Sequence, residues 1–100
     1  MIVRISEAIL VPGMTEEFMI RLNALVRDFP SHYDGLMSHE VLVDRTDPLR
    51  VSYVSRWRDE ASLVAYAGAS WASDPVTFPD EDRFLREPLA LRHFAPAEIG

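Results

Sequence analysis

Hydrophobic residues follow two different periods along the chain, and these periods predict where strands and helices lie. Residues 2–11 are rich in β-branched side chains and stop at Pro12-Gly13, which is typical of a strand that ends in a turn. From Met14 to Phe29 apolar residues recur every three or four positions, which predicts an amphipathic helix. We expect Thr15 to cap this helix and Pro30 to end it.

Two further strands are predicted at residues 36–44 and 50–58. The five residues between them include Asp47 and Pro48, which is typical of a hairpin loop. A loop of this length makes the two strands antiparallel neighbours.

The last part of the chain predicts one more helix and one more strand. Asp59 is expected to cap a helix over residues 60–67 that ends at a glycine. Residues 73–87 are expected to be mostly loop, with one helical turn near residues 80–85. Residues 88–95 alternate between apolar and polar and predict the final strand.

The predicted order of elements is that of the ferredoxin-like βαββαβ fold. This is an α+β fold in which a four-stranded antiparallel sheet carries two helices on one face. A chain of 100 residues has room for one core, so residues 1–100 are expected to form a single domain. Trp57 lies where the third strand meets the second helix, and we expect it to pin that helix to the sheet.

Both faces of the predicted sheet are apolar. The first strand places Val3 and Ile5 on one side and Ile2, Ala8 and Leu10 on the other. Helices cover only one face, and a bare apolar face of that size usually marks an interface. The sequence therefore predicts a homodimer packed sheet against sheet.

Composition narrows the classes of partner and cofactor. The net charge is −6 and the arginines are scattered, which argues against nucleic-acid binding. The chain has no cysteine and no glycine-rich dinucleotide or phosphate loop, so no cofactor is expected. Charged residues interrupt the N-terminal apolar stretch, and the uncharged run at residues 61–73 is too short to cross a membrane. We expect a cytoplasmic protein.

The three histidines do not predict a metal site. In the expected strand order His39 and His93 lie on opposite edges of the sheet, about 14 Å apart at ~4.8 Å per strand. His32 lies in a loop, and the spacing of the three lacks the pattern that zinc sites use.

One region predicts a small apolar ligand site. The helix that carries Tyr66 is otherwise built from small residues, which leaves space beside the sheet. Trp71 follows that helix at a position where the hydrophobic pattern does not require a large ring. It therefore either lines a pocket or simply packs against the protein core. The competing interpretation is that Phe78 and Phe84 fill the space.

Two neighbours on the last strand are candidates for chemistry and point to opposite faces. Arg92 either holds an anionic substrate oxygen or bridges to a carboxylate. His93 is a candidate general base because an ordinary histidine is largely neutral at pH 7.

Several stretches together resemble a known family. The first strand, the following VPGMTEEF, and the stretch GLMSHEVLVDRTDPLRVSYVSRWRDEASLVAY are similar to the antibiotic biosynthesis monooxygenase-like (ABM) family of the dimeric α+β barrel superfamily. The resemblance covers residues 1–68 and implies a dimeric ferredoxin-like protein. Enzymes of this family oxidise polycyclic aromatic phenols with O2 and no cofactor, and some relatives degrade haem.

The family's functional motifs are incomplete in this chain. Cofactor-free members carry an Asn three residues before a Trp in the second-helix region, whereas Gly68 stands three residues before Trp71. Haem-degrading relatives use an Asn on the first strand and a His about ten residues after the Trp. Here the first strand has Ser6 and Glu7, and Glu81 stands ten residues after Trp71.

Three hypotheses follow. The leading one is a cofactor-independent monooxygenase that oxidises a small aromatic or phenolic substrate with O2. Such a reaction needs a base, a cation and an apolar pocket. The candidate catalytic residues are His39, His93 and Arg92, and the candidate substrate-binding residues are Tyr53, Tyr66, Trp71 and Phe78. A second hypothesis is a non-catalytic protein that binds or senses a small ligand, and a third is haem degradation.

Overall fold

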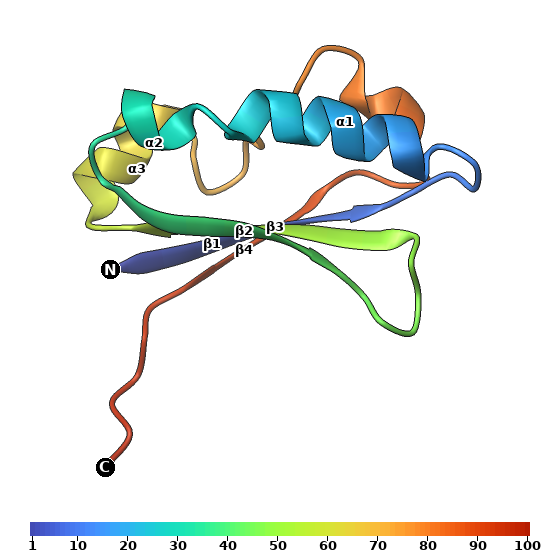
Figure 1. The fold of residues 1–100 in the computed structure, drawn as a ribbon. Coiled ribbons are helices and arrows are strands. Elements are labelled where there is room, and N and C mark those ends of the chain that lie inside the picture. Colours follow the sequence, from blue (N-terminus) through green and yellow to red (C-terminus); the bar gives the residue numbers. More distant parts are fainter.

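A computed structural model describes residues 1–100 and gives four strands, three helices and one 3-10 turn (Figure 1). Their bounds are β1 (Ile2–Ile9), α1 (Thr15–Val26), α2 (Phe29–His32), β2 (Leu36–Val43), β3 (Arg50–Trp57), α3 (Glu60–Ala67), the 3-10 turn η1 (Glu81–Phe84) and β4 (Ala90–Phe94). The strands pair antiparallel in the order β2-β3-β1-β4. This confirms the predicted ferredoxin-like α+β fold and strand order.

The helices all lie on one face of the sheet, and the last residues of the chain run away on the opposite side (Figure 1). We call the helix-covered side the inner face and the other side the outer face. No helix of the chain is long and apolar enough to cross a membrane.

The first helix differs from the prediction at both ends. It ends at Val26, and Pro30 lies instead in the first turn of the separate helix α2. Proline has no N–H to donate, which matters little in a first turn because the N–H groups there have no partner within the helix. Thr15 is the first residue of α1, and the capping position is taken by Met14 without a side-chain hydrogen bond.

The start of α3 is as predicted. The carboxylate of Asp59 accepts hydrogen bonds from the backbone N–H of Ser62 at 2.9 Å and from its hydroxyl at 2.7 Å. Ser62 also lies against Gly35, where a Cβ atom would collide with the serine side chain. Glycine at this position therefore lets α3 approach the start of β2.

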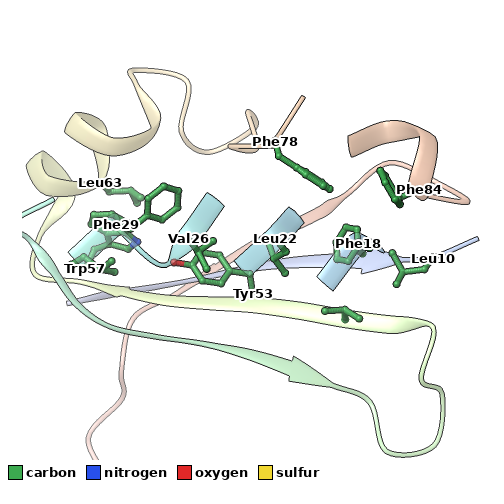
Figure 2. Packing of buried hydrophobic residues seen from close by; sticks show 13 residues of the cluster. Leu10, Phe18, Leu22, Val26, Phe29, Tyr53, Trp57, Leu63, Phe78 and Phe84 are labelled. Atoms are coloured by element: carbon green, nitrogen blue, oxygen red, sulfur yellow. The ribbon is translucent and has the colours of Figure 1, made fainter. Parts of the chain in front are cut away.

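Trp57 anchors the core at one end of the layer between sheet and helices (Figure 2). Its side chain is fully buried, and its Nε1–H donates to Ser55 Oγ at 2.9 Å. Its ring stacks on Tyr66 of α3 with centroids 4.6 Å apart. The prediction that Trp57 pins this helix to the sheet is confirmed.

Phenylalanines close the other end of the layer (Figure 2). Phe78 packs edge-on against Phe18 of α1 and stacks on Phe84, with ring centroids 5.6 Å apart in both pairs. All three rings are buried. Phe78 and Phe84 therefore fill the space at this end.

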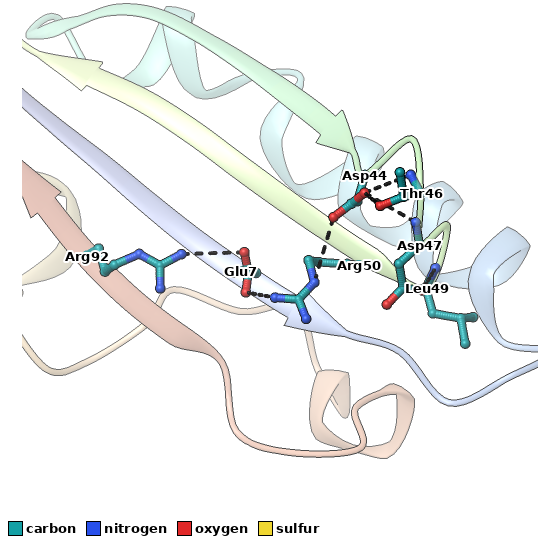
Figure 3. A network of polar contacts seen from close by, with 7 residues as sticks. All are labelled: Glu7, Asp44, Thr46, Asp47, Leu49, Arg50 and Arg92. Carbon is teal, nitrogen blue, oxygen red and sulfur yellow. Dashed lines mark hydrogen bonds and ion pairs between the residues drawn. The ribbon is translucent and has the colours of Figure 1, made fainter.

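The outer face combines apolar side chains with a charged network. Glu7 lies between two arginines and accepts from Arg50 at 2.9 Å and from Arg92 at 3.4 Å (Figure 3). Around this network the strand register places apolar residues on the same face: Val3, Ile5, Leu42, Val54 and Phe94. Leu42 and Phe94 are each 48% exposed.

Strand β2 contains one extra residue. Leu36 pairs with Trp57 and Ser38 pairs with Arg56, the preceding residue of β3, so Met37 is a bulge without a partner. The bulge changes which positions of β2 face the helices, and it places both Leu36 and His39 on the inner face.

Candidate functional site

A small cavity of about 20 Å3 lies between the inner face of the sheet and the helices. This volume holds roughly one water molecule. Most of the lining is apolar and comes from α1 and the sheet, including Phe18, Leu22, Val26 and Val51. Five polar side chains also reach it: Arg4, Ser6, Tyr53, Tyr66 and Glu81.

Arg4 is a buried cation without an acidic partner. It lies on the inner face of β1 and is only 3% exposed. Its guanidinium donates to the carbonyl oxygens of Trp71 at 2.7 Å and Asp74 at 2.9 Å, and its Nη1 lies 3.0 Å from His93 Nε2. No carboxylate forms an ion pair with it. Burial lowers the pKa of Arg4, but arginine remains charged in proteins.

Glu81 is the buried acid of the cavity. It is 5% exposed, and its Oε1 accepts from the backbone N–H of Phe78 at 3.2 Å. No arginine pairs with it. Burial raises the pKa of Glu81 to about 7, and the hydrogen bond from Phe78 acts in the opposite direction with the smaller effect. A carboxyl group that titrates near neutrality is suited to accept and return protons at pH 7.

The two tyrosines supply neutral hydroxyl groups. Burial raises the pKa of Tyr66 to about 12 and also raises the pKa of Tyr53. The Arg4 guanidinium lies over the Tyr66 ring, 5.8 Å from its centroid. The Tyr53 hydroxyl is bonded to His39 Nδ1 at 2.7 Å. At neutral pH both hydroxyls can donate a hydrogen bond to a ligand.

A surface cleft of about 470 Å3 adjoins the cavity. Its walls come from residues 75–89 and include Phe78, Pro79 and Pro88. Glu81 and Leu89 line both the cleft and the cavity, so the buried acid lies between the two spaces. The volume of the cleft is within the range of small-molecule sites.

Trp71 and His93, two of the residues predicted from the sequence, lie against Arg4. Trp71 contacts the His93 ring edge-on at 4.9 Å, and neither residue lines the cavity. Burial and the charge of Arg4 lower the pKa of His93, so its imidazole is neutral at pH 7. Its Nε2 faces Arg4, which leaves this nitrogen engaged rather than available to a substrate.

The other predicted residues divide between the two faces. Tyr53 and Tyr66 line the cavity, Phe78 lines the cleft, and His39 reaches the cavity only through Tyr53. Arg92 lies on the outer face, where it pairs with Glu7. The sheet therefore separates Arg92 from the cavity.

Sequence reasoning missed the two charged residues of the cavity. Arg4 and Ser6 alternate in phase with Ile2, Ala8 and Leu10, so the period of two already placed them on the buried side. Glu81 gave no such signal, because it stands in the acidic Asp80-Glu81-Asp82 run of a loop.

The geometry gives no metal centre. No three His, Asp or Glu side chains of the chain come close enough together to hold a metal ion.

Comparisons with known proteins identify both a family and a fold. The family model for "antibiotic biosynthesis monooxygenase" matches residues 1–70. A comparison with curated proteins gives no significant match.

Among solved structures, one described as antibiotic biosynthesis monooxygenase superposes with a TM-score of 0.76 at 15% identity, covering 98% of this chain and 100% of that one. Rv0793 from Mycobacterium tuberculosis gives 0.77 at 16% identity, covering 98% and 96%. PA3566 from Pseudomonas aeruginosa gives 0.74 at 20% identity, covering 97% and 94%. Because the identities are this low, the superpositions show a shared fold alone.

Proposed function

Because the chain belongs to the antibiotic biosynthesis monooxygenase family, we propose that it is a cofactor-independent monooxygenase that oxidises a small phenolic substrate with O2. The observation that carries the proposal is that Arg4 and Glu81, which do not pair with each other, both line one apolar cavity. Glu81 is the general base, and Arg4 stabilises the phenolate that deprotonation produces. The apolar walls exclude water and strengthen both effects.

The reaction needs no external reductant when the substrate supplies the electrons. Glu81 takes the phenolic proton, and the phenolate ring carbon next to the oxygen forms a bond to O2. The resulting peroxide anion takes up a proton. The ring C–H bond and the O–O bond then break, which leaves a quinone and water. One oxygen atom of O2 ends in the quinone and the other in water, and the substrate provides all four electrons.

The cleft supports the proposal by supplying room that the cavity lacks. A cavity of about 20 Å3 cannot hold an aromatic ring, whereas the cleft of about 470 Å3 can. The substrate ring lies in the cleft against Phe78 and the prolines, and its hydroxyl enters the water-sized cavity that Glu81 and Arg4 line. This arrangement retains Tyr66 and Phe78 from the sequence prediction and leaves out Arg92.

We also propose that two copies pack through their outer faces. Four of the five apolar side chains there are at least partly exposed, and Glu7 and Asp44 neutralise the arginines beside them. A neutralised, largely apolar face is suited to burial against its own copy.

The test is O2 consumption with a panel of small hydroquinones, phenols and anthrones. Glu81→Gln is expected to lower turnover by about 10²- to 10⁴-fold, the usual contribution of a general base. Glu87→Gln is the matched control, because it makes the same change at an exposed carboxylate that lines neither the cavity nor the cleft, and it should leave turnover unchanged. Equal activity of Glu81→Gln and the parent would refute the assigned base.

A second candidate is a non-catalytic protein that binds a small aromatic ligand. The small volume of the cavity favours it, because a ligand held in the cleft alone touches Glu81 but not Arg4. This candidate predicts no O2 uptake with any phenol, together with a rise in the unfolding temperature when a ligand is added.

A further inference from the structure

Tyr53 connects the buried cavity to a second opening on the protein surface. Its side chain lines the cavity, and it also lines an open groove of about 390 Å3 that contains His39. Tyr53 is 8% exposed and His39 is half-buried. This groove lies at the β2 edge of the sheet, whereas the proposed substrate cleft is formed by residues 75–89. The molecule therefore has a second polar connection between the cavity and solvent.

The connection is a short hydrogen bond between two groups that can exchange protons. Tyr53 Oη lies 2.7 Å from His39 Nδ1, and the two rings meet edge-on with centroids 5.7 Å apart. His39 makes no other side-chain hydrogen bond, so its Nε2 is left to solvent in the groove. The charged side chains that line this groove are Arg27, which follows α1, and Glu40 of β2. Glu40 is itself paired with Arg56 at 3.5 Å.

Burial makes an isolated tyrosinate at position 53 costly, since it raises the pKa of this hydroxyl. Tyr53 can therefore pass its proton into the cavity only if another proton replaces it at the same time. His39 is the only titratable group bonded to the hydroxyl.

We propose that Tyr53 and His39 form a relay that carries a proton between solvent in the groove and the reacting oxygen in the cavity. The inference rests on the proposed oxidation. The Tyr53 hydroxyl proton goes to the peroxide anion, and the Nδ1 proton of the protonated His39 goes to the Tyr53 oxygen. A hydroperoxide, a neutral tyrosine and a neutral histidine result, and His39 regains its proton from groove water. Tyr53 is then a catalytic residue, and His39 is a positioning residue that acts through it.

A first experiment tests the relay without any substrate. In protein labelled with 13C at the tyrosine Cζ, the hydroxyl exchange rate with solvent is measured by NMR in an H2O/D2O mixture. His39→Gln keeps a hydrogen-bond acceptor but cannot pass a proton, so we expect exchange at Tyr53 to slow at least about 10-fold. Tyr66 is the internal control, because its hydroxyl lies in the same cavity without a bonded imidazole. Unchanged exchange at Tyr53 would overturn the relay.

A second experiment uses turnover. His39→Ala is expected to lower O2 consumption, and added imidazole, which fits the open groove, is expected to restore it in a concentration-dependent way. Tyr53→Phe should lose activity without such rescue. Failure of imidazole to rescue a folded His39→Ala protein would contradict the relay. If the parent consumes no O2 but the hydroxyl exchange still depends on His39, the oxidation fails and the proton path stands.

Discussion

Each side of the sheet carries acidic and arginine side chains, but these charges are paired on the outer face and unpaired on the inner face. On the outer face Glu7 is shared between Arg50 and Arg92, and Asp44 also pairs with Arg50, so the two acids and the two arginines cancel within the protein (Figure 3). On the inner face Glu81 and Arg4 line one cavity, but each is held by backbone groups and neither has a partner of opposite charge.

The difference indicates what each face is for. A neutralised network costs less to bury against another protein surface than isolated charges do. Unpaired charges in an apolar cavity are costly unless something compensates them, and such groups cluster at functional sites because they remain available to a ligand. The outer face is therefore suited to an interface and the inner face to chemistry.

The largest expected effect is the loss of dimer affinity when charges are added to the outer face. The double substitution Leu42→Asp and Phe94→Asp adds charges at two partly exposed outer-face positions. A folded monomer should tolerate them, whereas a dimer would have to bury them. We expect the dimer dissociation constant to rise at least about 100-fold, as for unpaired charges worth ~3 kcal/mol or more. Sedimentation velocity over a concentration series measures it.

The matched control is Ile20→Asp, which charges an even more exposed apolar position, 64% exposed, on helix α1. It should leave the association unchanged. An outer-face variant that associates as strongly as the parent would show that the dimer uses another surface.

The next effect concerns Glu81 on the inner face and the dependence of stability on pH. The folded protein raises the pKa of Glu81 from 4.5 to about 7, so folding favours its neutral form. The contribution of this group to stability is fully present below about pH 4.5 and is lost as pH rises to about 7. Glu81→Gln should therefore raise the free energy of unfolding at pH 8 by about 3 kcal/mol relative to pH 4, at ~1.36 kcal/mol per pKa unit. Urea denaturation at both pH values measures this difference.

Glu7→Gln is the comparison for that experiment. It removes an acid that already has two arginine partners, so it should give no gain in stability at pH 8. Equal pH dependence in both variants would mean that Glu81 is not distinguished by its burial.

The smallest effect concerns Arg92, which the sequence suggested as a substrate-binding cation. Its side chain is 53% exposed, and its bond to Glu7 is long at 3.4 Å. Arg92→Gln should change the free energy of unfolding by about 0.5 kcal/mol or less. It should also leave ligand affinity unchanged, as measured by calorimetry, whereas Arg4→Gln should weaken the binding of a phenol. A loss of affinity in Arg92→Gln would place the substrate on the outer face.

The sequence predicted the architecture well because strands and helices leave periodic patterns. The alternation along β1 assigned Ile2, Ala8 and Leu10 to one face, and the hairpin and the Asp59 cap followed from local chemistry. The site was harder to predict, because the candidates that the sequence offered were mainly histidines and aromatic residues near loops. The burial of Arg4 was predictable, because it alternates in phase with the buried residues of β1, but that strand carries no other sign of a functional site.

Glu81 was beyond sequence reasoning for a physical reason. Its burial depends on how residues 73–89 fold back over the sheet, which no local period specifies. Only the tertiary arrangement turns one acid of an acidic run inward and leaves its two neighbours exposed.

The bulge at Met37 has a consequence for how this chain tolerates change in length. An unbroken β2 with Leu36 facing the helices would also turn Ser38, Glu40 and Leu42 inward and would send His39 outward. The inserted residue lets the two halves of the strand keep separate alignments, one set by the close approach of α3 and the other by the hairpin. Removing Met37 while both ends stay anchored would leave an even ladder, so this position is where the edge strand can lose a residue without exchanging its two faces.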